Sequence, residues 1–64
     1  MPDAKINGPE IDDVDVKRLL VEEITNAMEK AYNIPRKGYV VTIVENQPEN
    51  IAIGGVLNVD RKTG

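Results

Sequence analysis

The chain has 64 residues, a formal net charge of −3 at pH 7, two Tyr as its only aromatic residues, and neither Cys nor His. The lack of Cys and His excludes disulfides, the usual zinc sites and the catalytic arrangements built on His, so we expect no metal site. The acidic balance and the scarcity of aromatic side chains argue against a nucleic-acid partner. A chain of this length is one domain, residues 1–64, and is marginally stable unless it self-associates.

The N-terminal segment, MPDAKINGPE, has no basic stretch followed by an apolar run, so we expect no signal peptide. No apolar run is long enough to span a membrane, so we expect no membrane partner. The absence of Cys is compatible with a reducing compartment. These features together predict a cytoplasmic protein.

The first predicted element is a short strand over residues 3–7. Ala4 and Ile6 alternate there with polar residues, which is typical of a half-buried strand. Gly8 and Pro9 then favour a turn, and proline cannot donate to a strand ladder. The strand should therefore end at this pair.

A helix follows the turn. Asp12, Asp13 and Asp15 provide an N-cap and acidic charge for its first turn. The helix should end near Tyr32 or Asn33, because Pro35 disfavours helical geometry at Ile34. Apolar residues recur between these limits at helical spacing and predict an apolar stripe of Val16, Leu20, Ile24, Ala27 and Ala31, widened by Leu19 and Met28.

Two apolar segments complete the chain. Residues 39–45 are rich in β-branched residues and nearly apolar throughout, which predicts a strand buried on both faces. After a turn over residues 46–50, the apolar stretch 51–57 contains Gly54-Gly55, which indicates a bulge or a hairpin. Residues 60–64 form a polar tail. We therefore predict an α+β fold: a βαβ unit with parallel strands, followed by a C-terminal hairpin.

One face of this predicted sheet has no partner within the chain. A single helix covers only one side, and alternate residues of the strand 39–45 face the other. An exposed apolar patch of this kind usually marks an interface. We expect the sheets of neighbouring subunits to pack together in an oligomer.

Pro2 is the candidate catalytic residue. Methionine aminopeptidases remove Met before small residues, including proline, which leaves a secondary amine at the N-terminus. An α-amino group titrates at about 7.7–8.0, and burial or nearby cations lower its pKa further. A base whose pKa lies near the working pH suits proton transfer. Alternatively, Pro2 is only a stiff residue before a strand.

The whole chain resembles the 4-oxalocrotonate tautomerase family of short subunits. The similarity runs from Pro2 to about Val59 and rests on the length, the Met-Pro start, the βαβ order, the helix ending before Ile34-Pro35, the apolar second strand and the segment Ile53-Gly-Gly-Val-Leu57. The resemblance implies that Pro2 moves a proton between carbon and oxygen of a small keto-enol acid. It also implies a homohexamer built as a trimer of dimers, with no cofactor.

Three positions differ from the family pattern. The two arginines that bind and polarise the substrate's carboxylates in the family fall on Asp12 and Val40, and an aromatic residue that helps to keep the pocket dry falls on Ile51. The resemblance therefore identifies Pro2 as the catalytic residue without supplying the usual cations.

Other residues are candidates for binding a carboxylic acid substrate. Cations are available at Arg36 and Lys37, before the second strand, and at Arg61 and Lys62 in the tail. Arg36 is the preferred candidate, although an ordinary solvated charge explains it equally well. Ile51 is expected to line the apolar pocket. The candidate set is completed by Tyr39, either as a lining residue or hydroxyl donor or as packing at a subunit interface.

The sequence therefore predicts a tautomerase that acts on a 2-hydroxydienoate-like acid through Pro2. Two alternatives remain. Protonated Pro2 could serve as the acid in hydration or dehalogenation of an unsaturated acid, or form an imine with a carbonyl. The chain could also be a non-catalytic oligomeric module that has kept the fold.

Overall fold

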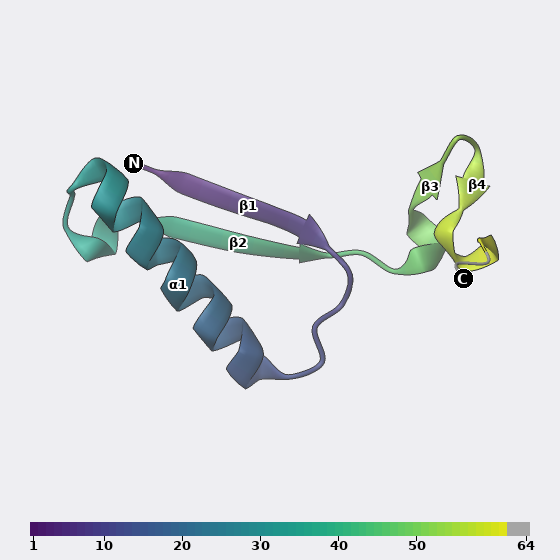
Figure 1. Ribbon diagram of the computed structural model, residues 1–64, viewed down its shortest axis with the longest axis horizontal. Helices are drawn as coiled ribbons and strands as arrows, with labels where there is room; N and C mark the ends of the chain where they lie inside the picture. Colours follow the sequence, from purple (N-terminus) through teal and green to yellow (C-terminus); the bar gives the residue numbers. More distant parts are fainter. Residues whose placement is uncertain (62–64) are drawn as a thin grey trace.

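The computed structural model describes residues 1–61, and its elements follow the predicted order (Figure 1). Within residues 1–61 there are five regular elements: strand β1 (Asp3–Gly8), helix α1 (Val14–Tyr32), strand β2 (Val40–Glu45) and the short strands β3 (Ala52–Ile53) and β4 (Val56–Leu57). Three 3-10 turns join or follow them: η1 (Arg36–Gly38), η2 (Pro48–Asn50) and η3 (Asn58–Asp60). The predicted α+β fold, a βαβ unit followed by a hairpin, is confirmed.

Strands β1 and β2 are parallel neighbours, as predicted. Asp3 lies opposite Val40 at one end, and Gly8 lies opposite Glu45 at the other. Backbone bonds extend the ladder at both ends. The Val40 amide donates to the Pro2 carbonyl at 3.1 Å, and the Asn46 amide donates to the Gly8 carbonyl at 2.8 Å. The ladder therefore fixes Pro2 beside the start of β2.

Helix α1 is capped at both ends by its own sequence. The Asp13 side chain accepts a hydrogen bond from the Asp15 amide at 2.8 Å, which satisfies a free N–H of the first turn. At the C-terminus, Asn33 adopts a left-handed conformation with φ of 54° and donates its N–H to the Glu29 carbonyl at 2.9 Å. Both helix limits agree with the sequence prediction.

The helix packs across one face of the sheet (Figure 1). The half-buried apolar residues of this face are Leu20, Val21, Ile24 and Met28. The predicted stripe is wrong in part, because Val16 and Leu19 remain 50% and 55% exposed and Ala27 and Ala31 are exposed as well. The apolar residues of α1 are spread over more than one face, and the packing on the sheet selects only one of them.

The other face of the sheet carries Val40 and Thr42, both exposed, and no other element of the described chain covers it (Figure 1). None of the described residues is buried. The predicted burial of residues 39–45 on both faces is thus not achieved within one chain.

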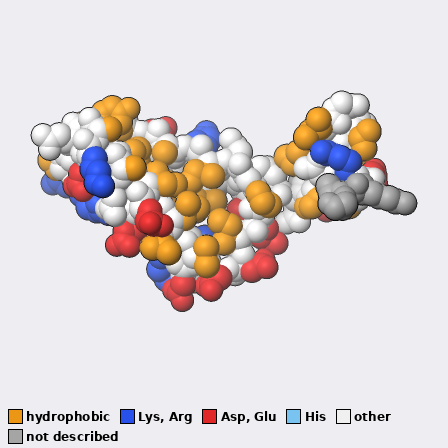
Figure 2. Space-filling model, in the orientation of Figure 1, with side chains coloured by type: hydrophobic (Ala, Val, Ile, Leu, Met, Phe, Trp, Pro, Cys, Tyr) orange, Lys and Arg blue, Asp and Glu red, His pale blue; other side chains and the backbone are white. Residues whose placement is uncertain are grey.

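The chain is extended for its size. Its radius of gyration is 15.3 Å, against about 11 Å for a compact domain of this length. Its accessible surface is 5161 Å², against about 4,100 Å² for a compact monomer of 7.1 kDa. Much of this surface is apolar, and Figure 2 shows hydrophobic side chains over both the helix-sheet body and the C-terminal hairpin. No helix within residues 1–61 has the length and hydropathy needed to cross a membrane.

The C-terminal hairpin stands away from the sheet (Figure 1). Gly54 and Gly55 both have positive φ, 61° and 84°, as a tight two-residue hairpin turn requires. Of the two structures that the Gly pair indicated, a bulge or a hairpin, the hairpin is confirmed. Its apolar side chains remain open to solvent, with Ile53 63% exposed.

Candidate active site

Pro2 is held at one end of the sheet. Its carbonyl accepts from the Val40 amide, and the residue is half-buried. Met1 extends into solvent and is 91% exposed. Removal of Met1 would therefore leave the Pro2 nitrogen at a fixed position beside the start of β2.

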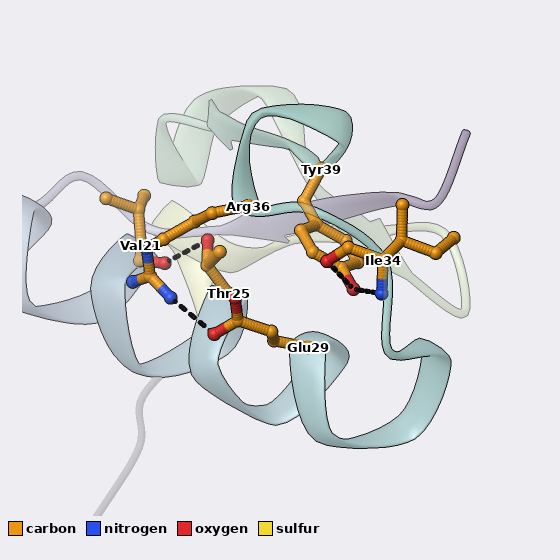
Figure 3. Close-up of polar contacts among 6 residues, drawn as sticks. All are labelled: Val21, Thr25, Glu29, Ile34, Arg36 and Tyr39. Carbon is orange, nitrogen blue, oxygen red and sulfur yellow. Dashed lines mark hydrogen bonds and ion pairs between the residues drawn. The ribbon is translucent and has the colours of Figure 1, made fainter.

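The loop between α1 and β2 approaches the same end of the sheet. The Tyr39 hydroxyl accepts from the Ile34 amide at 2.9 Å and donates to the Ile34 carbonyl at 3.0 Å (Figure 3). These two bonds close the loop and engage the hydroxyl within its own chain. The ring of Tyr39 is half-buried.

The cations of this loop differ in their partners. Arg36 donates through Nη1 to Glu29 Oε1 at 3.0 Å, which joins the loop to the last turns of α1 (Figure 3). Both side chains are almost half exposed, so the pair is partly screened by solvent. Lys37 is exposed and makes no ion pair with the residues of the described chain.

A pocket of about 480 Å³ lies at the opposite end of the sheet. It opens between the end of β1 and the C-terminal segment, and its lining residues are Asn7, Gly8, Pro9, Asn46, Pro48, Ile51, Asn58 and Arg61. Most of these are neutral or apolar. Among the described residues that line it, Arg61 is the one charged side chain, and it donates through Nη2 to Asn58 Oδ1.

The predicted site residues are therefore divided between two places. Pro2 and the loop residues Arg36, Lys37 and Tyr39 lie toward one end of the sheet, whereas Ile51 and Arg61 line the pocket at the other. Strand β1 separates the two ends and has six residues, which at about 3.3 Å per residue spans roughly 20 Å. One chain does not bring the two groups together. Lys62 lies outside the described residues.

A hydrogen bond and an ion pair hold the loop before α1 at the end of the sheet where the pocket lies. Glu45 Oε2 accepts from the Ile11 amide at 2.7 Å and pairs with Lys17 Nζ at 3.0 Å. The bond from Ile11, then that from Lys17, lowers the pKa of the Glu45 carboxyl below its usual value of 4.5. Asp12, next to Ile11 and at the position of a family arginine, is exposed at this end. Among residues 1–61, no group of three or more carboxylate, His or Cys side chains is placed to hold a metal ion.

The pocket also contains three asparagines that the sequence does not predict as site residues, Asn7, Asn46 and Asn58. No spacing in the sequence relates these residues, because a strand end, a loop and a 3-10 turn bring them together. Asparagine is common in turns for local reasons, so its occurrence at these positions does not indicate a shared pocket.

Solved structures of similar proteins share the fold of this chain over nearly its whole length. The structure is similar to YwhB, a homologue of 4-oxalocrotonate tautomerase, with a TM-score of 0.86 and 26% identity over 95% of this chain and 100% of the other. A 4-oxalocrotonate tautomerase isozyme from Methylibium petroleiphilum gives a TM-score of 0.77 and 34% identity over 94% and 100% of the two chains.

A heterohexamer 4-oxalocrotonate tautomerase from Chloroflexus aurantiacus shares the fold, with a TM-score of 0.82 and 21% identity over 97% and 100% of the two chains. No curated protein sequence matches this chain significantly. The model of the tautomerase family, described as tautomerase enzyme, matches residues 2–61. This match begins at Pro2 and covers nearly the whole sequence, so the chain belongs to the tautomerase family.

Proposed function

We propose that Met1 is removed and that the amine of Pro2 catalyses keto-enol tautomerisation of a small 2-hydroxydienoate-like acid. The amine accepts the proton of the enol hydroxyl, the O–H electrons form the carbonyl, and the resulting ammonium returns a proton to carbon. The observation that supports this most is the placement of Pro2. It is the first residue of the family match, and the Val40 amide holds its carbonyl at the end of the sheet.

The chemistry suits a secondary amine in this position. Its ordinary pKa of about 8 lies close to neutrality, so both protonation states are available in one catalytic cycle. Pro2 is half-buried, and covering it further would disfavour the charged form and lower its pKa. The amine needs no cofactor for this reaction.

The proposal includes a site shared between copies of the chain. Pro2 of one copy would face the pocket that contains Ile51 in another, because these residues are too far apart to meet within one chain. The extended shape and uncovered apolar surface support such an assembly. A homohexamer, a trimer of dimers, is the form that we propose, and the relative from Chloroflexus aurantiacus is a heterohexamer of the same fold.

The test compares three preparations, each checked by intact mass. The processed protein should tautomerise 2-hydroxypenta-2,4-dienoate, followed by ultraviolet absorbance. A chain with one Gly inserted between Met1 and Pro2 carries its proline nitrogen in an amide, and we expect its kcat/KM to fall at least 100-fold. Pro35→Ala, which changes an exposed loop proline, should retain activity. Equal activity of the processed and Gly-inserted chains would refute the role of Pro2.

A related reaction is the second candidate, because Asp12 and Val40 occupy the positions of the family's two arginines. A Pro2 amine with a pKa well above neutrality would favour acid chemistry, such as hydration or dehalogenation of an unsaturated acid. Trapping of a carbonyl adduct by borohydride would point to imine formation. If the processed protein has none of these activities, the remaining alternative is a non-catalytic oligomeric module that has kept the fold.

A further inference from the structure

We propose that the Glu45 carboxylate, by binding the Ile11 amide, fixes the loop in which Pro9 forms a wall of the substrate pocket. Glu45 is thus a positioning residue, which acts through the backbone of the loop and not by contact with the substrate. The inference rests on the proposed function and deepens it by naming what shapes the binding site.

The loop concerned joins β1 to α1 and contributes Pro9 to the lining of the pocket (Figure 1). Proline has no N–H, so Pro9 cannot donate a backbone hydrogen bond that would hold it in place. The position of this wall therefore depends on the residues that precede and follow it.

Two hydrogen bonds tether the loop to the end of β2, one on each side of Pro9. The Gly8 carbonyl accepts from the Asn46 amide at 2.8 Å, and the Ile11 amide donates to Glu45 Oε2 at 2.7 Å. Within the described chain, this second bond is the only one that the loop makes before the helix cap. The conformation of the pocket wall therefore depends on Glu45.

An ion pair with α1 holds the Glu45 carboxylate in place. Lys17 Nζ lies 3.0 Å from the same oxygen, Oε2, that accepts from the Ile11 amide. The Lys17 and Glu45 side chains are 32% and 27% exposed, less than those of the other ion pairs in the described chain, so solvent screens this pair less. A carboxylate also binds a backbone N–H more strongly than a neutral oxygen does. One oxygen thus joins β2, the loop and the helix.

Loss of the Glu45 contact would release the wall without removing a group from the pocket. Glu45 is not among the described residues that line it. A loop that must become ordered when a ligand binds costs affinity, and this cost is the same for the substrate and for the transition state. Such a uniform loss of binding raises KM and changes kcat little.

The first experiment compares two substitutions of Glu45 in the processed protein, with 2-hydroxypenta-2,4-dienoate as substrate. Glu45→Ala removes the acceptor of the Ile11 amide, and we expect KM to rise about fivefold, as for one lost hydrogen bond, with kcat within about twofold of the parent. Glu45→Gln keeps an oxygen that accepts this bond and should bring KM back to within about twofold of the parent. An unchanged KM in Glu45→Ala, or equal increases in both variants, would overturn the proposal.

Matched controls separate positioning from a general loss of stability. Arg18→Gln removes the cation next to Lys17, whose ion pair with Asp15 is exposed, and should leave KM unchanged. Asn33→Ala weakens the cap at the other end of α1 and should lower stability without changing KM. If Asn33→Ala raises KM as much as Glu45→Ala does, the effect follows stability and the proposal is refuted. Matching circular dichroism spectra identify the variants that fold.

Hydrogen exchange tests the loop without catalysis. The Ile11 amide should be protected in the parent protein and should exchange at least about tenfold faster in Glu45→Ala, with the amides of β1 unchanged. Lys17→Gln is a milder change and should speed this exchange by a smaller factor. If the Ile11 amide of the parent exchanges as fast as an unstructured one, the proposal is refuted, even where Glu45→Ala does not fold.

Binding of pentanoate, which is not turned over, distinguishes failure of this proposal from failure of the proposed function. NMR titration of the processed protein should give a Kd about fivefold weaker for Glu45→Ala than for the parent. If pentanoate binding weakens in this way but no enol acid is turned over, the proposed function fails and the positioning role stands. If the Kd is unchanged while the Ile11 amide is released, the loop does not shape the site and the proposal fails.

Discussion

The exposed apolar side chains of the C-terminal hairpin lead us to predict that this surface is buried when copies of the chain assemble. Ile53 is 63% exposed in the single chain. Full burial of an isoleucine side chain is worth about 1.5–3 kcal/mol, so covering the exposed part contributes about 1–2 kcal/mol per chain. Ile53→Asp removes this gain and places a carboxylate in the contact, where desolvation costs several kcal/mol more. The same substitution in an isolated chain changes stability by only about 0.5 kcal/mol.

Sedimentation velocity and thermal unfolding over a range of protein concentrations show whether Ile53 is buried in an oligomer or remains exposed on an isolated chain. The parent protein should sediment as an oligomer, with an unfolding temperature that rises with concentration. Ile53→Asp should sediment as a smaller species and lose that dependence. Asn26→Asp adds the same charge at an exposed helix position and should behave like the parent. If Ile53→Asp keeps the parent's mass and stability, this surface lies outside the interface and the reasoning fails.

Three further predictions concern the local contacts of the chain. The pKa of Glu45 is lowered by the fold, so its contribution to stability is present above the unfolded value and is lost as pH falls through the folded value. Urea midpoints should therefore fall less between pH 5 and pH 3 in Glu45→Gln than in the parent, and parallel curves would contradict this. Asn33→Ala should cost about 1 kcal/mol in unfolding free energy, because Asn33 has positive φ, whereas Asn33→Gly should cost less; equal losses would contradict the cap. Tyr39→Phe leaves the backbone of Ile34 without its two bonds and should cost about 1 kcal/mol by denaturant titration, with no loss expected if those bonds are absent in solution.

Local signals predicted most of the fold. Helix α1 begins and ends where an acidic cap and a residue before a proline indicated, and both caps act within a few residues of their own position. The glycine pair at residues 54 and 55 likewise sets its own turn. The parallel pairing followed from the length of the connection between the two strands, because a helix separates them.

The buried side of the helix was harder to predict. Apolar residues lie on more than one side of α1, and the helical period alone does not say which side meets the sheet. The structure places Val21 there and leaves Val16 and Leu19 exposed. This choice depends on the angle at which the helix crosses the sheet, which is a tertiary property.

The pocket could not be predicted from the sequence, for a similar reason. The sequence predicts Ile51 and Arg61 as separate candidates, but their shared pocket with Asn7 depends on where the C-terminal segment lies relative to the end of β1. The separation of this pocket from Pro2 also needs the three-dimensional structure. It is the observation that turns the expectation of an oligomer into a proposal about a shared site.

The central claim is that a free amine at Pro2 performs proton transfer. It is tested most directly by the pH dependence of kcat/KM for 2-hydroxypenta-2,4-dienoate, measured on protein whose intact mass proves that Met1 is absent. We predict activity that depends on a single amine titrating near neutrality and that falls at least 100-fold in the Gly-inserted chain. Activity that is equal in both chains, at every pH, would contradict the account.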